Sequence, residues 1–419
     1  LSKYNEAIRL DREHRLAYLS RGDLYLKEER FGDAIKDYGE VIRLAPQEAV
    51  TYKKRGWTYN ALGQLPEALT DYDKAIEINP EDVDSLLARG GILQALERFE
   101  DAISDYSRVI ALDPEQAVAL RNRGRSQQAL CRLPEALEDY EQALCLAPED
   151  ALTSYYRGSL GRILERLPEA LAYLGEAIRL DHQNASAYAE RGAVFHTLGR
   201  HQEALDDLDT AIQLMPNLEA YYFERGQIHR SLGSYEAAVA DFDQAARMNL
   251  DDVLIIFNRG KTYQDSGRFL EALQDYDKVI NLDNEFADAY LRRGYTKLAL
   301  EQFEEALDDM NRAIQLEPDN IAYFCRRGDV NKAFGRTEEA INDYTEAILL
   351  FTEKGAQQAK SDQEREQLEE TLSDAYFGRG TLFSILGRIE EATADFSKAI
   401  SLNIDKPAES QGQSKAIDH

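Results

Sequence analysis

Apolar residues recur three and four positions apart along almost the whole chain, which is the spacing of one face of an α-helix, and no stretch alternates apolar and polar residues as a strand does. The segment AYLSRGDLYL at 17–26 is one such stretch, and it sets an arginine beside a glycine. The pair returns at a constant step of 34 residues from Arg21-Gly22 to Arg327-Gly328, and again at Arg379-Gly380 after a gap of 52. A fixed period of this length indicates stacked repeat units.

Each repeat is predicted to contain two antiparallel helices. An alanine follows every one of these glycines by twelve residues, as Ala34 follows Gly22, so two helices can approach closely where neither carries a bulky side chain. An aromatic residue four positions after most of these alanines, such as Tyr38, fills the adjoining groove. Glycines that permit a tight turn lie between the two halves at Gly63, Gly199, Gly233, Gly267, Gly335 and Gly387.

The arginine of the Arg-Gly pair is interpreted as a structural residue that holds the helices together, and not as a ligand-binding group. Ten of the eleven copies carry an aspartate fifteen residues beyond the glycine, and the exception is Tyr173 in the fifth copy. This pattern predicts a ladder of partly buried Arg–Asp ion pairs at the helix interfaces, such as Arg21 with Asp37.

These residues and their period resemble the tetratricopeptide repeat family. The resemblance implies an all-α fold, an α-solenoid in which helix-turn-helix repeats form a right-handed superhelix and the first helix of each repeat lines a concave groove. Residues 15–354 correspond to ten contiguous repeats of 34 residues, and 373–406 to an eleventh. Residues 1–14 match the second helix of a truncated repeat, so the array is expected to extend further toward the N-terminus.

The rhythm of the repeats breaks once, in an insert at 355–372. Leu368, Leu372 and Tyr376 continue one apolar stripe at a spacing of four. The insert is therefore predicted to form a helical extension of the eleventh repeat, and a polar loop is the alternative. Residues 407–419 lack periodicity and are predicted to be a disordered tail.

Composition narrows the class of protein. The 419 residues carry a net charge of −28, which disfavours nucleic acid and anionic membranes as partners. No apolar run is long enough to span a bilayer, and the three cysteines form no disulfide framework, so a cytoplasmic protein is expected, although the start at Leu1 leaves a signal peptide open.

No motif for catalysis is found in the sequence. It contains no phosphate-binding glycine loop and no nucleophile elbow, and neither its histidines nor its cysteines have the spacing of a metal site. The sequence therefore predicts no enzyme activity, no metal and no cofactor.

The candidate site is the groove that the resemblance implies. With Arg-Gly counted as positions 7 and 8, the family architecture places positions 2, 5, 6, 9, 12 and 13 on the concave side, where basic residues outnumber acidic ones in this chain. The candidate partner-binding residues at these positions are Lys53, Lys54, Trp57, Arg121, Asn122, Arg125, Tyr155, Tyr156, Arg162, Phe223, Phe257, Lys261, Arg292 and Arg326. Such cations and aromatics suit an acidic or amphipathic protein segment, whereas packing between repeats and plain solubility are the alternative roles.

The carboxylate clamp known in the family is absent as a set. Asn258 and Arg292 match its pattern, but Phe223, Gln227 and Asp288 do not.

Two functions remain open from the sequence. The first is a non-catalytic scaffold that binds a peptide or protein segment in a mildly basic, aromatic-bearing groove. The alternative is the recognition or sensor module of a larger enzyme or signalling ATPase, truncated at its N-terminus. The sequence does not identify the partner, and the oligomeric state is unknown.

Overall fold

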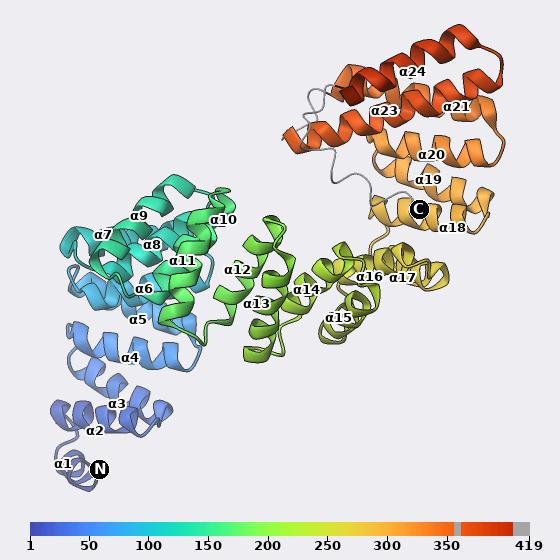
Figure 1. Cartoon of the computed structure of the whole chain (residues 1–419). Helices are drawn as coiled ribbons and strands as arrows, with labels where there is room; N and C mark the ends of the chain where they lie inside the picture. Colours follow the sequence, from blue (N-terminus) through green and yellow to red (C-terminus); the bar gives the residue numbers. More distant parts are fainter. Residues whose placement is uncertain (356–361, 405–419) are drawn as a thin grey trace. The chain divides into compact units, whose positions relative to one another are not determined.

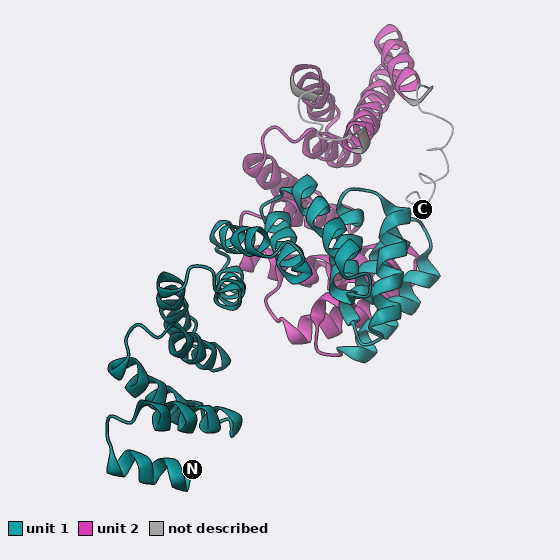
Figure 2. Cartoon of the chain, turned by 90° about the vertical axis from the view of Figure 1, so that its left-hand side faces the viewer, with its two compact units in different colours: residues 1–215 teal, residues 216–419 magenta. Residues whose placement is uncertain are grey.

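The computed structural model describes residues 1–355 and 362–404, and every element within these ranges is a helix (Figure 1). The chain divides into two compact units, residues 1–215 and 216–419, which Figure 2 colours separately. The tail predicted at 407–419, and residues 356–361 of the predicted insert, lie outside the described residues.

Unit 1 consists of one leading helix and six helix pairs. The leading helix is α1 (Ser2–Leu10), which packs on α2. The first helices of the pairs are α2 (Arg15–Lys27), α4 (Ala49–Ala61), α6 (Val83–Ala95), α8 (Ala117–Ala129), α10 (Ala151–Ile163) and α12 (Ala185–Thr197). The second helices are α3 (Phe31–Leu44), α5 (Leu65–Ile78), α7 (Phe99–Leu112), α9 (Leu133–Leu146), α11 (Leu167–Leu180) and α13 (His201–Leu214).

Unit 2 continues the same pairing. Its first helices are α14 (Glu219–Ser231), α16 (Val253–Asp265), α18 (Ala287–Ala299), α20 (Ile321–Ala333) and α23 (Asp362–Ile385). Its second helices are α15 (Tyr235–Met248), α17 (Phe269–Leu282), α19 (Phe303–Leu316), α21 (Thr337–Leu350) and α24 (Ile389–Ile404), and a short π-helix, η1 (Phe351–Gly355), follows α21.

The two helices of a pair meet at the glycine of the Arg-Gly motif. At Gly90, an added Cβ would lie 2.8 Å from the Cε1 atom of Tyr106, whose side chain is fully buried. The alanine on the facing helix, Ala102, is also fully buried. The glycine therefore receives the aromatic ring directly, and the small alanine lets the second helix approach.

The turns between paired helices use left-handed backbone. Gly63 has φ of +72°, as the predicted role of the interhelical glycines requires. The same turn in other pairs places Glu29, Glu97, Cys131, Glu165 or Glu301 at φ of 57–59°, where a side chain is strained.

The first helix of the last pair is longer than the others. Helix α23 has 24 residues, and it contacts both α20 and α21. Leu372 is buried, and Leu368 and Tyr376 pack against the same apolar cluster. The apolar stripe seen in the sequence thus faces the preceding helices.

Candidate partner-binding face

An arginine–aspartate ladder fixes the paired helices, as the sequence predicts. In each pair the arginine Nε and Nη groups donate to both carboxylate oxygens, at 2.5–3.2 Å. The pairs are Arg21–Asp37, Arg55–Asp71, Arg89–Asp105, Arg123–Asp139, Arg191–Asp207, Arg225–Asp241, Arg259–Asp275, Arg293–Asp309, Arg327–Asp343 and Arg379–Asp395.

The ladder also joins neighbouring repeats. Arg89 reaches Asp73 on the preceding second helix at 2.6 Å, and Arg21 donates to Asn5 on α1 at 2.7 Å. Aromatic rings one helical turn away flank several of these guanidinium groups, such as Tyr18 and Tyr25 around Arg21. The Arg-Gly motif is therefore engaged in the frame, and it is not presented to a partner.

The candidate binding residues lie on the first helices, and their polar contacts run from one first helix to the next. We give the name first-helix face to the side of the first helices that carries positions 2, 5, 6, 9, 12 and 13. In unit 1 it is formed by α2, α4, α6, α8, α10 and α12. In unit 2 it is formed by α14, α16, α18, α20 and α23. Neighbouring first helices contact one another from α4 to α12 in unit 1, and at α14–α16, α16–α18 and α20–α23 in unit 2.

The first cluster on this face is centred on Trp57. Lys53 binds Asp82 and Asp84, both at 3.0 Å, and Lys54 binds Asp23 at 2.7 Å. The Trp57 indole, one helical turn after these lysines on α4, is 50% exposed. Each lysine is thus held by a carboxylate of a neighbouring first helix or its N-cap, while the ring remains accessible.

The second cluster brings together α8, α10 and α12. Arg125 is exposed and lies over the Tyr156 ring at 5.7 Å, and that ring packs against Tyr155 at 5.1 Å. Arg121 binds Asp150 at 2.6 Å, and Arg162 binds Glu190 at 2.7 Å.

The remaining member of this cluster, Asn122, makes a structural contact through its backbone. The Asn122 carbonyl oxygen accepts from the Gln94 amide and from the Ser126 hydroxyl, so its backbone ties α8 to α6.

The candidate residues of unit 2 differ in exposure. Phe223 is half-buried against Phe242, and Phe257 is only 7% exposed, packed on Tyr276 and Phe286. The Phe257 ring is therefore part of the packing beneath the first-helix face, and little of it is accessible to a partner. Burial and the neighbouring cations Arg230 and Arg292 lower the pKa of Lys261 to about 8.

Arg326 lies on α20, the next first helix after α18. Its guanidinium is 3.3 Å from Asp329 and 5.6 Å from the centre of the Tyr295 ring. The Tyr295 hydroxyl donates to the same carboxylate at 3.2 Å.

The first-helix face thus carries fewer unpaired cations than the sequence predicts. Lys53 and Arg121 at position 5 each meet an aspartate 29 residues further along, Asp82 and Asp150. These acids were missed because they precede the next first helix, outside the positions assigned to the groove. The repeated offset of 29 is the sequence signal that identifies them.

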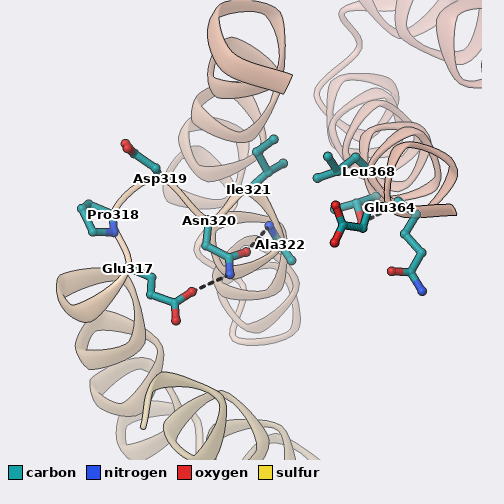
Figure 3. Close-up of a pocket in the computed structure, with 10 residues that line it drawn as sticks. Glu317, Pro318, Asp319, Asn320, Ile321, Ala322, Glu364 and Leu368 are labelled. Carbon is teal, nitrogen blue, oxygen red and sulfur yellow. Dashed lines mark hydrogen bonds between the residues drawn. The ribbon is translucent and has the colours of Figure 1, made fainter. Parts of the chain in front are cut away.

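A cavity of about 780 Å³ in unit 2 was not predicted (Figure 3). It lies between the segment 317–322 and the first turns of α23, where Glu364 and Leu368 face Ile321. Asn320 donates to Glu317 at 2.9 Å and accepts from the Ala322 amide at 3.2 Å. The cavity depends on the extension of α23, so the repeat pattern alone does not reveal it.

Two further features bear on the chemistry of the chain. Within 1–355 and 362–404, no group of three or more His, Cys, Asp or Glu side chains is arranged to hold a metal ion. The closest approach of histidines is His196 to His201, with their Nδ1 atoms 3.1 Å apart. None of the described helices is both long and apolar enough to cross a bilayer.

Comparison with protein families gives one consistent result. Four family models, each described as a tetratricopeptide repeat, match most of the chain. The matched residues are 1–49, 49–82, 83–116, 120–183, 164–219, 219–252, 255–286, 287–320 and 373–403. No curated protein matches the chain in a sequence search.

Solved structures of repeat proteins resemble the chain at low identity. YrrB, described as a TPR protein with an unusual peptide-binding site, is 26% identical, with 44% of this chain and 95% of YrrB covered and a TM-score of 0.39. Yeast Tom70 is 18% identical over 94% of this chain and 96% of its own, with a TM-score of 0.42. A tetratricopeptide repeat protein from Parabacteroides merdae is 19% identical over 62% and 98%, with a TM-score of 0.49. Family membership therefore rests on the family models.

Proposed function

Because this chain belongs to the tetratricopeptide repeat family, whose fold is generally a non-catalytic scaffold for protein interactions, we propose that its first-helix face is a groove that binds a peptide segment of a partner protein. The proposed role is binding without catalysis. The proposed partner segment carries at least one apolar or aromatic side chain and acidic groups.

The observation that carries the proposal is the setting of Trp57. A half-exposed indole lies one helical turn after two lysines that are each held by a carboxylate of a neighbouring repeat. Fixed neighbours lower the conformational entropy that binding would cost, and tryptophan is enriched among the residues that dominate interface energies. This arrangement suits an anchor for an apolar side chain.

Arg125 supplies the complementary charge in the same unit. It is exposed, it lies over the Tyr156 ring, and within the described residues no carboxylate lies within ion-pair distance of it. Arg121 and Arg162 are already paired, so Arg125 is the cation of the second cluster best placed to meet an acidic group.

The test begins with selection of binding peptides from a displayed random library on the full chain. The selected peptides are then measured against Trp57→Ala and Arg125→Glu, with Lys36→Glu as the matched charge reversal. Lys36 lies on the second helix α3 and its side chain is 81% exposed. We expect each of the first two variants to bind at least tenfold more weakly and the control to bind as the parent does.

Fluorescence gives an independent readout, since Trp57 is the single tryptophan of the chain. Bound peptide is expected to shift its emission in the parent and in Lys36→Glu. Selected peptides that bind both groove variants with unchanged affinity, and leave the emission unchanged, would place the binding surface elsewhere.

A further inference from the structure

Three cations converge on the first-helix face of unit 2, one from each of three successive first helices. Arg230 comes from the last turn of α14, Lys261 from the middle of α16 and Arg292 from α18. Arg230 reaches across to Asp265, one helical turn after Lys261 on α16, at 3.1 Å, and the charges of Arg230 and Arg292 both act on Lys261. We propose that Arg230, Lys261 and Arg292 form a subsite that binds one oxyanion, a carboxylate or a phosphate, carried by the partner peptide.

The acids of the chain neutralise this subsite only in part. Asp265 binds Arg230 at 3.1 Å, and Asp288 accepts a hydrogen bond from the Tyr323 hydroxyl at 3.1 Å. In the part of the chain that the structure describes, no carboxylate oxygen lies within 4.0 Å of a charged nitrogen of Lys261 or Arg292. Two of the three cations thus lack an ion-pair partner.

Arg230 also retains an unused donor. Its Nε group is buried and has no hydrogen-bond partner, although Nη1 is bound to Asp265. A buried donor without an acceptor costs free energy, and an acceptor from a bound ligand removes that cost.

Lys261 rests on an apolar floor. Its ammonium lies 5.6 Å from the centre of the Phe257 ring, which is held by Phe286 at 4.9 Å and by Tyr276 at 5.9 Å. Burial is the largest cause of its lowered pKa of about 8, and the two arginines add to it. An anion would reverse the second effect, because a nearby negative charge favours the protonated lysine.

The residue at position 9 varies from repeat to repeat. Two repeats have an aspartate there, Asp23 and Asp329, which accept from the hydroxyls of Tyr38 and Tyr344 at 2.8 and 2.7 Å. In the repeat of Lys261, the Tyr276 hydroxyl donates instead to Gln264 at 2.9 Å. Lysine at position 9 thus leaves a cation on this part of the face that the tyrosine hydroxyl does not engage.

The chemistry of the three groups defines the ligand. Guanidinium groups bind carboxylate and phosphate oxygens through parallel N–H donors, and an ammonium adds a point charge from the third side. The identification of the carrier as a peptide rests on the proposed function of the first-helix face. The geometry of the subsite itself specifies only the oxyanion.

The experiment uses the full chain and short blocked peptides that differ at one central residue, which is glutamate, phosphoserine or glutamine, with inorganic phosphate as a fourth probe. The side-chain signal of Lys261 is followed by NMR with ¹³C-labelled lysine and assigned by its loss in Lys261→Gln. Saturating glutamate or phosphoserine peptide is expected to raise the pKa of Lys261 from about 8 toward 10.5, and glutamine peptide to leave it unchanged. A response to the phosphoserine peptide but not to the glutamate peptide would identify phosphate as the required oxyanion, whereas a response to the glutamate peptide shows that a carboxylate suffices. A response to inorganic phosphate, with no response to either anionic peptide, would overturn the assignment to a peptide-borne group.

Variants locate the effect. Lys261→Gln and Arg292→Gln are expected to weaken binding of the anionic peptide at least tenfold. The matched control is Lys278→Gln, on the second helix α17 of the same repeat, where the lysine is exposed and donates to the Leu250 carbonyl. Equal binding by all three variants would overturn the subsite. If Lys261→Gln and Arg292→Gln bind the anionic peptide normally while Trp57→Ala and Arg125→Glu lose their selected peptides, the subsite is refuted and the proposed function stands. If instead only the subsite variants lose binding, the subsite stands and the proposed binding role of Trp57 and Arg125 is refuted.

Discussion

Arg157 is the one arginine of the Arg-Gly series that lacks its aspartate. Tyr173 takes that place, 4.8 Å from the guanidinium. The arginine side chain is only 2% exposed, yet its Nε and Nη1 groups have no partner, and Nη2 alone reaches Glu141 and Glu169. A buried cation is thus incompletely compensated, which weakens this repeat.

Restoring the aspartate is expected to stabilise the chain. In Tyr173→Asp the carboxylate can accept from Nε and Nη2, as Asp139 does from Arg123 in the preceding repeat, so that the unused Nε donor gains an acceptor. We expect about 1–2 kcal/mol of stabilisation after the loss of the ring contact. Urea denaturation followed by circular dichroism measures it. In an Arg157→Leu background the same change should destabilise, and destabilisation of the parent by Tyr173→Asp would refute this reading of the ladder.

Lys261 makes a second prediction, which concerns pH. The charged groups that act on it are Arg230, Arg292, Asp265 and Asp288. With a pKa of about 8 against an ordinary 10.5, its neutral fraction at neutral pH is roughly 300-fold larger than that of an ordinary lysine. We expect Lys261 to react before the other lysines with a limiting amine-directed ester, as identified by mass spectrometry, and anionic peptide to protect it.

The sign of the pH effect on stability follows from the same shift. The folded pKa lies below the unfolded one, so the charge of Lys261 costs stability below pH 8 and this cost disappears as pH rises from about 8 to 10.5. Arg292→Gln should raise the pKa and slow the labelling. Labelling of Lys36 or Lys278 at the same rate as Lys261 would contradict the lowered pKa.

At the scale of the helix pair, packing decides which glycines are required. Gly90 meets the Tyr106 ring, because an added Cβ would lie 2.8 Å from Cε1, whereas Gly32 has no atom within 4 Å of that position. Gly90→Ala is therefore expected to destabilise by about 1–3 kcal/mol through overpacking, and Gly32→Ala to stabilise by up to about 1 kcal/mol through helix propensity. Denaturation midpoints of both variants test the opposite signs, and two shifts of the same sign would contradict the close-packing role.

The turn between paired helices makes a separate prediction. Glu97 is exposed and has φ of 57°, in the region where Gly63 has +72°. Replacing Glu97 by glycine should stabilise by about 0.5–1 kcal/mol, because glycine adopts this backbone without a Cβ clash. Gly63→Ala is the reciprocal control and should cost a similar amount. Loss of thermal stability in Glu97→Gly would mean that its side chain contributes a contact that outweighs the backbone strain.

Many contacts within a helix pair can be predicted from the sequence, because the residues that make them recur at a fixed offset. The Gly90, Ala102 and Tyr106 contact and the Arg21–Asp37 pair are both set by the period of the repeat. The left-handed turn at Glu97 was not predicted, since glutamate carries no signal for it. Likewise the partners of Lys53 and Arg121 depend on how one repeat meets the next, and the acidic cavity beside Leu368 depends on the single departure from the period.

At the scale of the whole molecule, the net charge of −28 says little about either binding cluster. The face of unit 1 balances most of its cations with carboxylates, as at Lys54 and Asp23, whereas unit 2 leaves Lys261 and Arg292 without such partners. Local pairing between repeats, which the total charge does not reveal, therefore decides where an acidic group can bind.

The division of the chain into two units gives the last prediction. Contacts in a repeat array are between neighbours, so each unit should retain its own site when expressed alone. The contacts of Trp57 lie within 1–215, and those of Lys261 with Arg230, Phe257 and Arg292 lie within 216–419. We expect fragment 1–215 to bind the selected peptides in a manner dependent on Trp57, and fragment 216–419 to show Lys261 with a pKa of about 8. Circular dichroism establishes that each fragment is helical. If a helical 216–419 fragment showed Lys261 at the ordinary 10.5, the cation cluster would require more than its own unit, and the assignment of an independent anion subsite to unit 2 would be wrong.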